Sequence, residues 1–281
     1  MTLFLGIDGG GTGCRAAVAD AAGHVLGFGR SGPANIASDP ETARLNILAA
    51  TRDALTHAVG LSEVETALPH LTAGLGLAGA NSAGAAGRLR LALPFRARVE
   101  TDAIAAVKGA LRDHNGIVAA LGTGSVFASQ RGGVIRQIGG WGLTLGDEGS
   151  GAKLGRSILS QALRAVDGFT PMTPLLAELI AEHGSPEAIV TFAQTARPAD
   201  FAAIAPRLVA LQDPAAVTVM NQALADVTEA ISHLQAGGTL PVVFIGGLGP
   251  TYAGRLATCW PIRPALGTAL DGALLLAREA G

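Results

Sequence analysis

Lysine, cysteine and charged residues in general are scarce in this 281-residue chain. Only 15% of the residues are charged and the formal net charge is −2, which argues against a nucleic-acid-binding surface because such a surface needs a basic stripe. The two cysteines, Cys14 and Cys259, are too few for a disulfide framework or a four-cysteine metal site. Neither lysine, Lys108 or Lys153, follows a glycine and precedes Ser or Thr, so the chain has no P-loop.

Several other patterns are missing. No apolar run reaches the length of a membrane-spanning helix, and the N-terminus lacks the basic region and cleavage pattern of a signal peptide. We therefore expect a cytoplasmic protein that binds neither membrane nor nucleic acid. The sequence contains neither a Gly-x-Ser-x-Gly elbow nor a His-Glu-x-x-His helix, so a hydrolase would have no recognisable nucleophile or metal site. Residues 74–79 match the dinucleotide pattern Gly-x-Gly-x-x-Gly after a strand, but residues 80–84 are a poor helix start, which disfavours that site.

Glycine is abundant, and its densest cluster lies near the N-terminus. An apolar run ends in Asp8, residues 9–13 read Gly-Gly-Gly-Thr-Gly, and a second apolar stretch follows. Two strands joined by such a turn form a hairpin whose exposed N–H groups can bind an anion. Thr12 adds a hydroxyl group, and Asp8 adds an oxygen ligand suited to Mg²⁺. The segment is therefore either a nucleotide-phosphate clamp or an ordinary tight hairpin.

The same pattern returns in the middle of the chain. Residues 117–121 are apolar, 122–125 read Gly-Thr-Gly-Ser, and residues 126–129 and 134–138 are extended. This strand–glycine turn–strand repeat predicts two related lobes. Two hairpins of the phosphate-binding type suggest that a nucleotide is held between them.

The remaining elements follow from periodicity and capping signals. Asp39 and Pro40 begin a helix that Gly60 ends, and a β-β-β-α-β-α-β order fills roughly the first 101 residues. The other expected elements are strands at 3–8, 14–20, 23–30, 68–78, 97–101 and 241–245, and helices at 102–113, 150–166, within 171–217, around 224–234 and at 268–278.

Six segments, taken together, resemble the superfamily of sugar kinases, actin and heat-shock chaperone ATPases. Within it the chain resembles the N-acetylglucosamine kinase and glucosamine kinase family, which is grouped with the BadF/BadG/BcrA/BcrD ATPases. The segments span nearly the whole chain in the family's order, and the Trp-Gly to Asp-Glu-Gly-Ser stretch is the most specific. They are FLGIDGGGT (4–12), TDA (101–103), LGTGS (121–125), GGWGLTLGDEGS (139–150), VFIGGLG (243–249) and TALDGA (268–273).

The resemblance implies an α/β fold of two ribonuclease H-like, actin-like ATPase lobes with an interdomain cleft. We expect the first lobe at 1–101 and the second at 102–281, with a helical insert at about 168–220 and a last helix that packs back on the first lobe. The resemblance also implies a homodimer.

The resemblance implies ATP and Mg²⁺ as cofactors. Asp8 would hold Mg²⁺ through water. Because no Walker lysine is present, Mg²⁺, backbone dipoles and helix N-termini would have to neutralise the phosphates. The groups that would bind the nucleotide come from three glycine turns: Gly9, Gly10, Gly11 and Thr12; Thr123 and Gly124; and Gly247 and Gly249 at the adenosine.

Asp102 stands where a strand passes into a helix. With the resemblance, we predict that it is the general base that takes the proton of the sugar 6-hydroxyl, a role that contributes ~10²–10⁴-fold to rate. The alternative is that Asp102 only caps its helix.

The resemblance also assigns the sugar contacts, which have the amide, hydroxyl, carboxylate and indole groups that suit a polyol. They are Asn35, Asp102, Ser125, Gly140, Trp141 and Asp147. Trp141 could equally fill space in a core, and Glu148 is left as a structural candidate.

Val126 departs from the family pattern, because the animal N-acetylglucosamine kinase has Asn there. An apolar side chain tolerates an acetyl group without requiring it, whereas a free 2-amine would favour a carboxylate such as Asp147. We expect N-acetylglucosamine slightly ahead of glucosamine. Two other functions stay open: a BadF-type ATPase that activates a dehydratase or reductase, which would need an iron–sulfur cluster, and a sugar sensor without catalytic activity.

Overall fold

The computed structural model describes residues 2–280 and contains two β-sheets. The first sheet has the strand order β3-β2-β1-β4-β5. Its strands are β1 (Phe4–Gly9), β2 (Cys14–Ala19), β3 (Val25–Ser31), β4 (Thr72–Leu77) and β5 (Arg96–Thr101). Strands β1, β2 and β3 pair antiparallel, whereas β1, β4 and β5 run parallel. The predicted three-stranded meander followed by crossover strands is confirmed.

The second sheet repeats this arrangement. Its order is β8-β7-β6-β9, and β6 pairs parallel with β9. In both sheets the first strand of a meander lies between the second strand and a later parallel strand, which confirms the internal repeat. The strands are β6 (Gly116–Leu121), β7 (Ser125–Arg131), β8 (Val134–Gly139) and β9 (Val242–Ile245).

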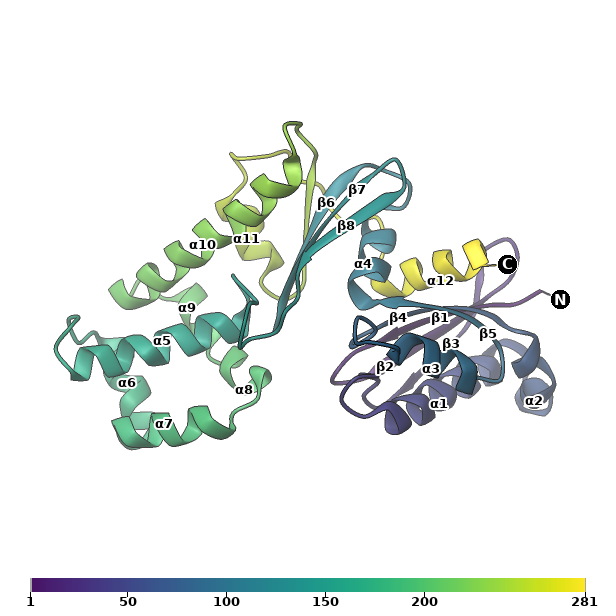
Figure 1. Ribbon diagram of the computed structural model, residues 1–281, viewed down its shortest axis with the longest axis horizontal. Coiled ribbons are helices and arrows are strands. Elements are labelled where there is room, and N and C mark those ends of the chain that lie inside the picture. The colour runs from purple at the N-terminus through teal and green to yellow at the C-terminus, as the bar shows by residue number, and fades with distance from the viewer. Residues whose placement is uncertain (1, 281) are drawn as a thin grey trace. The chain divides into compact units, whose positions relative to one another are not determined.

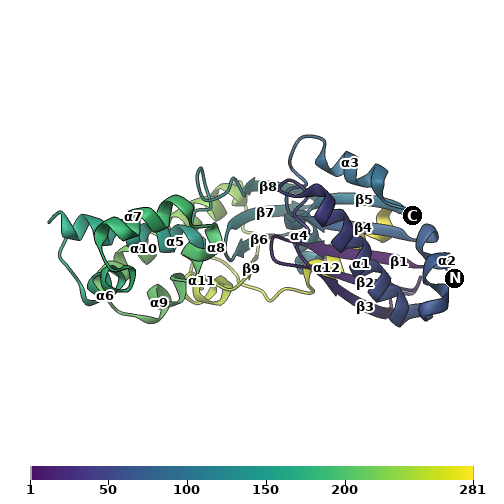
Figure 2. The same ribbon diagram turned by 90° about the horizontal axis from the view of Figure 1, so that it is seen from below.

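Helices cover both faces of the first sheet (Figures 1 and 2). The helices α1 (Pro40–Val59), α2 (Val64–Ala67) and α3 (Ala85–Ala92) lie on one face, and α4 (Asp102–Leu111) and α12 (Ala269–Ala280) on the other. The start of α1 is as predicted, because the Asp39 side chain accepts the N–H of Thr42 and Pro40 occupies the first helical position. The strand expected at 68–78 begins only at Thr72, since Leu68–His70 form a 3₁₀ turn that contains a proline.

The chain divides into two compact units, which differ from the expected lobes. Unit 1 comprises Met1–Asn115, Gln130–Ile135 and Pro264–Gly281, and unit 2 comprises Gly116–Ser129 and Arg136–Arg263. We expected the first lobe to end at residue 101. The helix α4 belongs with unit 1 because it packs against α12, which itself packs on β1 and β4.

In unit 2, α10 and α11 pack against the sheet, and α5 packs against the helices from α6 to α10. Ser150 caps α5 by accepting the N–H of Lys153, and the core includes Val227 and Tyr252, both fully buried. The helices are α5 (Gly151–Val166), α6 (Pro174–His183), α7 (Pro186–Thr195), α8 (Pro198–Ala202), α9 (Ala205–Ala210), α10 (Pro214–Gln235) and α11 (Gly249–Arg255).

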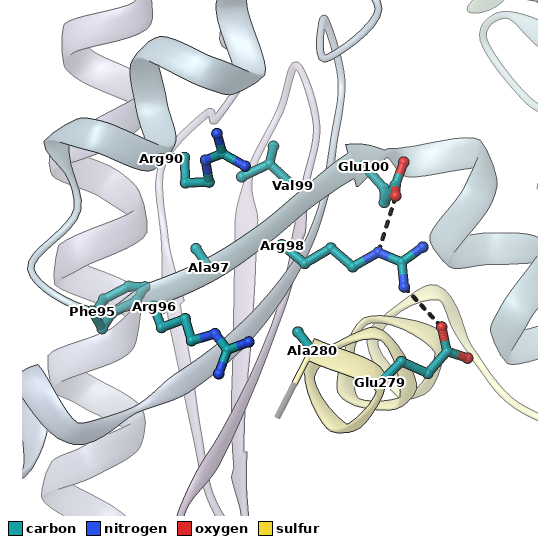
Figure 3. Close-up of a pocket in the computed structure, with 9 residues that line it drawn as sticks. All are labelled: Arg90, Phe95, Arg96, Ala97, Arg98, Val99, Glu100, Glu279 and Ala280. Atoms are coloured by element: carbon teal, nitrogen blue, oxygen red, sulfur yellow. Dashed lines mark hydrogen bonds and ion pairs between the residues drawn. The ribbon is translucent and has the colours of Figure 1, made fainter.

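The edge strand β5 borders a hollow of about 550 Å³ (Figure 3). Arg98 links β5 to α12, because its guanidinium donates to Glu100 on the same strand at 3.0 Å and to Glu279 of α12 at 2.9 Å. Figure 3 shows Arg90 and Arg96 on opposite sides of the strand, so their charges do not converge on one point. Charged side chains of this kind protect a sheet edge against pairing with another strand.

Within residues 2–280, no helix combines the length and the apolar character needed to cross a membrane.

The contact between α4 and α12 gives a stability prediction. A Cβ at Gly272 would lie 1.9 Å from the carbonyl oxygen of Ala105, so Gly272→Ala must push the two helices apart. We expect urea unfolding to show a loss of about 1–3 kcal/mol, the usual cost of overpacking. Gly87→Ala, in α3, is the control: its Cβ meets nothing within 4 Å, so the change should stabilise by up to about 1 kcal/mol. Equal stability of the two variants would contradict this packing.

Candidate functional site

The turn between β1 and β2 is closed by a hydrogen bond from the N–H of Gly10 to the carbonyl of Gly13 at 2.9 Å. Its glycines serve different purposes. A Cβ at Gly9 would lie 2.7 Å from Leu77, so this glycine is required by packing. Nothing lies within 4 Å of a Cβ at Gly10 or Gly11, so these two positions leave the backbone open to a ligand. The structure thus separates the packed start of the turn from its accessible part.

A hollow of about 360 Å³ lies beside this turn, within unit 1. Asp8 lines it and forms an ion pair with Arg15, its cross-strand partner on β2. Arg30, the partner of Arg15 on β3, lines the hollow too. Both arginines escaped the sequence analysis. The signal that could have found them is their equivalent place in the predicted meander, where alternating strand residues share one face.

The segment between β3 and α1 is tied to this turn. The N–H of Ala34 donates to Gly10, and the N–H of Ile36 donates to Ala78 just after β4. Asn35 lies between them, and its side-chain oxygen accepts the N–H groups of Ala37 at 3.0 Å and Ser38 at 3.2 Å. Its side-chain NH₂ group is therefore the end that is left to bind a ligand.

Asp102 is the first residue of α4, and its helix is capped by its neighbour. Thr101 is the N-cap, with its hydroxyl accepting the N–H of Ile104 at 3.2 Å, so the expectation that Asp102 itself might cap the helix is wrong. The Asp102 carboxylate instead accepts the N–H of the next residue, Ala103, at 2.9 Å. The residue keeps contact with solvent, yet surrounding protein atoms desolvate its carboxyl group.

This environment changes the acidity of Asp102. Burial is the largest cause that raises its pKa above the usual value, and the negative charge of Asp8 raises it further. Asp8 lies near the carboxyl end of β1, and Asp102 follows the carboxyl end of β5. Both strands run parallel to β4, which lies between them, so the two carboxylates lie at the same edge of the sheet. Unit 1 therefore brings together four of the predicted groups: the glycine turn, Asp8, Asn35 and Asp102.

The second glycine turn, in unit 2, is held against the start of α5. The N–H groups of Gly151 and Ala152 donate to the carbonyls of Gly122 and Thr123, at 2.8 and 3.1 Å. Helix N-terminal donors that could bind an anion are thus used inside the protein. The Thr123 side chain remains exposed on the turn.

Ser125 and Asp147 are buried within unit 2. The Ser125 hydroxyl donates to the carbonyl of Glu148 at 2.8 Å. Burial raises the pKa of Asp147, against the backbone hydrogen bonds from Ser125 and Gly142, which lower it. A Cβ at Gly124 would lie 3.0 Å from the Asp147 carboxylate. Both side chains brace the turn, and their role as sugar contacts stays a prediction.

Trp141 is the exposed part of the same loop, with 74% of its surface accessible. A space-filling role in a core is therefore excluded within unit 2. Gly140 before it and Gly142 after it have φ values of 74° and 79°, which side chains rarely adopt. A Cβ at Gly140 would lie 3.5 Å from Val126, so the valine noted in the sequence borders this loop.

The turn after β9 contains the remaining glycines. The N–H of Leu248 donates to Leu121 at the end of β6, which joins this turn to the neighbouring strand. Nothing lies within 4 Å of a Cβ at Gly247, whereas Gly249 begins α11 and packs on Phe244. Only Gly247 is open to a ligand.

Asp8 is the residue of unit 1 that could hold Mg²⁺. Among the described residues, no group of three or more His, Cys, Asp or Glu could hold a metal ion. Mg²⁺ commonly binds through one carboxylate, several waters and substrate phosphates. A single half-buried Asp8 beside an open turn fits that mode, although no all-protein cage is present.

Comparisons with known proteins bear on the family and the fold of the chain. The chain is 32% identical to the glucosamine kinase GspK of Vibrio cholerae over an alignment of 290 residues. This alignment covers 99% of this chain and 96% of that protein. A solved structure from Chromobacterium violaceum, named as a candidate N-acetylglucosamine kinase, shares 30% identity and a TM-score of 0.86 over 99% of each chain. A ROK family glucokinase from Streptomyces griseus, solved with glucose and AMPPNP, shares the fold, with a TM-score of 0.60 and 20% identity over 99% of each chain.

The two-sheet α/β fold predicted from the sequence is thus confirmed as the fold of the actin-like sugar kinases. The model of the BadF/BadG/BcrA/BcrD ATPase family matches residues 5–254. This match spans most of the chain, and the protein belongs to the BadF/BadG/BcrA/BcrD ATPase family.

Proposed function

We propose that this protein is an ATP-dependent amino-sugar kinase that phosphorylates the 6-hydroxyl group of glucosamine or N-acetylglucosamine. The observation that carries the proposal is the carboxylate of Asp102, accessible and of raised pKa, beside Asp8 and the open glycine turn. Membership of an ATPase family and similarity to GspK support ATP as the phosphate donor and an amino sugar as the acceptor.

Asp102 acts as the general base. Its carboxylate accepts the proton of the 6-hydroxyl while that oxygen bonds to the γ-phosphorus and the bond to ADP breaks. A raised pKa makes the carboxylate a stronger base at neutral pH. The Ala103 N–H fixes one carboxylate oxygen, Oδ1, which leaves Oδ2 for the hydroxyl.

The groups of the first glycine turn bind the phosphate chain. The N–H groups of residues 11–13 and the Thr12 hydroxyl donate to phosphate oxygens, whereas the N–H of Gly10 closes the turn. Arg15 and Arg30 supply the positive charge that the missing P-loop lysine would otherwise give. Asp8 would hold Mg²⁺ through water, and the ion would neutralise developing charge on the phosphates.

We place glucosamine ahead of N-acetylglucosamine. GspK is named as a glucosamine kinase and aligns over nearly the full length of both chains, whereas the Chromobacterium violaceum structure of similar coverage is named only as a candidate N-acetylglucosamine kinase. The sequence alone slightly favoured the acetylated sugar. Val126 borders Gly140 and offers no hydrogen bond to an acetyl oxygen. On unit 2, Trp141 is exposed and can stack on the apolar face of a pyranose ring.

The cysteines disfavour the dehydratase-activator alternative. Cys14 is buried, and this burial raises the pKa of its thiol to about 12, so it resists forming the thiolate that an iron–sulfur cluster needs. Cys259 alone is exposed.

Substrate choice gives the first test. We expect ADP release in the presence of Mg-ATP with glucosamine, a smaller kcat/KM with N-acetylglucosamine, and negligible turnover without sugar. The purified protein should contain no stoichiometric iron. Sugar-independent ATP hydrolysis together with bound iron would favour the activator instead, and sugar binding without turnover would favour a sensor.

Replacement of the proposed base gives the second test. Asp102→Asn should lower kcat by about 10²–10⁴-fold, with sugar binding measured by calorimetry nearly unchanged. Asp113→Asn, an exposed aspartate just beyond α4, is the matched control and should keep full activity. An active Asp102→Asn protein would exclude Asp102 as proton acceptor.

The same substitution should stabilise the fold. Because burial raises the folded-state pKa of Asp102 above its unfolded value, this group's contribution to stability is lost as pH rises through the folded-state pKa. Asp102→Asn should therefore increase the free energy of unfolding at pH 7, and the gain should shrink as the pH approaches about 4. Urea unfolding at several pH values checks this; a destabilised variant at pH 7 would contradict the pKa direction.

Arg30 gives the last test here. Arg30→Ala should raise the KM for Mg-ATP and leave the KM for the sugar unchanged, since the guanidinium borders the phosphate hollow. Arg96→Ala, an exposed arginine on β5, is the control. If both variants bind ATP like the wild type, Arg30 has no part in phosphate binding.

A further inference from the structure

Strand β4 lies between β1, which contains Asp8, and β5, which leads directly into Asp102. In its register, Gly76 stands between Asp8 of β1 and Glu100 of β5. Both neighbours of Gly76 in the sheet therefore carry a carboxylate, whereas Gly76 itself has no side chain. What fills the space above it is the first turn of α4.

The space above Gly76 is fully used. A Cβ at this position would lie 2.3 Å from the Cβ of Ala105 and 3.6 Å from the Cα of Asp102. Real Cβ atoms essentially never approach another atom more closely than 3.0 Å, so one of the two elements would have to move. Gly76 is not among the residues with positive φ, which means that packing and not backbone conformation requires glycine here.

Ala105 transmits any displacement to Asp102. The two residues are three positions apart in α4, which places them on the same side of the helix, one turn from each other. Ala105 is completely buried, so it cannot turn away from the strand. A helix that is pushed outward at Ala105 therefore carries the carboxylate of Asp102 away from Asp8.

We propose that Gly76 and Ala105 form a spacer that sets the position of Asp102, and that Gly76 is a positioning residue for phosphoryl transfer. The proposal rests on the proposed kinase function. A displacement of about 1 Å of a reacting group can cost on the order of 100-fold in rate. Substrate binding through the glycine turn would be untouched, because neither residue lines the hollow beside it.

The contact between the two residues also predicts a rescue. Removing the Ala105 methyl group in the presence of an alanine at 76 removes the 2.3 Å contact, and the next atoms, at 3.6 Å, are at ordinary van der Waals distance. The double variant Gly76→Ala/Ala105→Gly should therefore return Asp102 to its place. It should not regain full stability, because glycine inside a helix is unfavourable.

Five variants test the spacer: Gly76→Ala, Ala105→Gly, their combination, Gly27→Ala, and Gly27→Ala/Ala105→Gly. Gly27 on β3 is the control, because a Cβ there would lie 2.2 Å from the carbonyl oxygen of Ala54 in α1, a clash at least as severe and away from Asp102. We expect Gly76→Ala to lower kcat on the order of 100-fold with both KM values unchanged. Gly27→Ala should lose stability but keep kcat, and Ala105→Gly should restore kcat only in the Gly76→Ala background.

The outcomes separate the spacer from the kinase function. If the wild type is active but Gly76→Ala retains its kcat, or loses it without rescue, the positioning role is wrong while the kinase stands. If no sugar is phosphorylated at all, the kinase proposal fails, and urea unfolding still tests the contact. Ala105→Gly should then destabilise the wild type and stabilise Gly76→Ala, whereas additive effects would overturn the spacer.

Discussion

Close backbone packing at glycine positions, between helices and the sheet and between two helices, fixes the geometry of unit 1. A Cβ at Gly74 would lie 2.2 Å from a carbonyl of α12, and one at Gly109 would lie 1.8 Å from the carbonyl of Thr268. The helices α4 and α12 can approach β4 and each other only because these side chains are missing. Such close packing leaves little room for small shifts, because interiors are packed like crystals. The position of Asp102 at the first turn of α4 is a consequence of this packing.

The two halves of the chain share a topology but differ in chemistry. The turn of unit 1 carries a carboxylate, two arginines and an open backbone, which suits a metal–phosphate complex. The corresponding turn of unit 2 uses its carbonyls to bind the start of α5, and its buried Ser125 and Asp147 brace the loop that displays Trp141. The repeated strand order therefore carries charged groups beside an open turn in one unit and a braced loop with an exposed tryptophan in the other.

The sequence predicted what depends on local signals. The cap at Asp39, the strand–glycine turn–strand repeat and the fold class were all visible, because capping residues, glycine clusters and alternation act over a few positions. It did not predict what depends on which elements become neighbours. Arg30 joins the hollow beside the first glycine turn only through its pairing with Arg15. The cap of α4 proved to be Thr101, because Asp102 and Thr101 compete for the same role and only backbone angles decide between them.

We propose that phosphate passes from ATP to the primary hydroxyl of an amino sugar. Nuclear magnetic resonance of the products formed from Mg-ATP and glucosamine tests it most directly, since coupling of carbon 6 to phosphorus identifies the bonded oxygen. We expect one glucosamine phosphorylated at O6 for each ADP formed. Inorganic phosphate beside unchanged sugar, or phosphate on another oxygen, would contradict it.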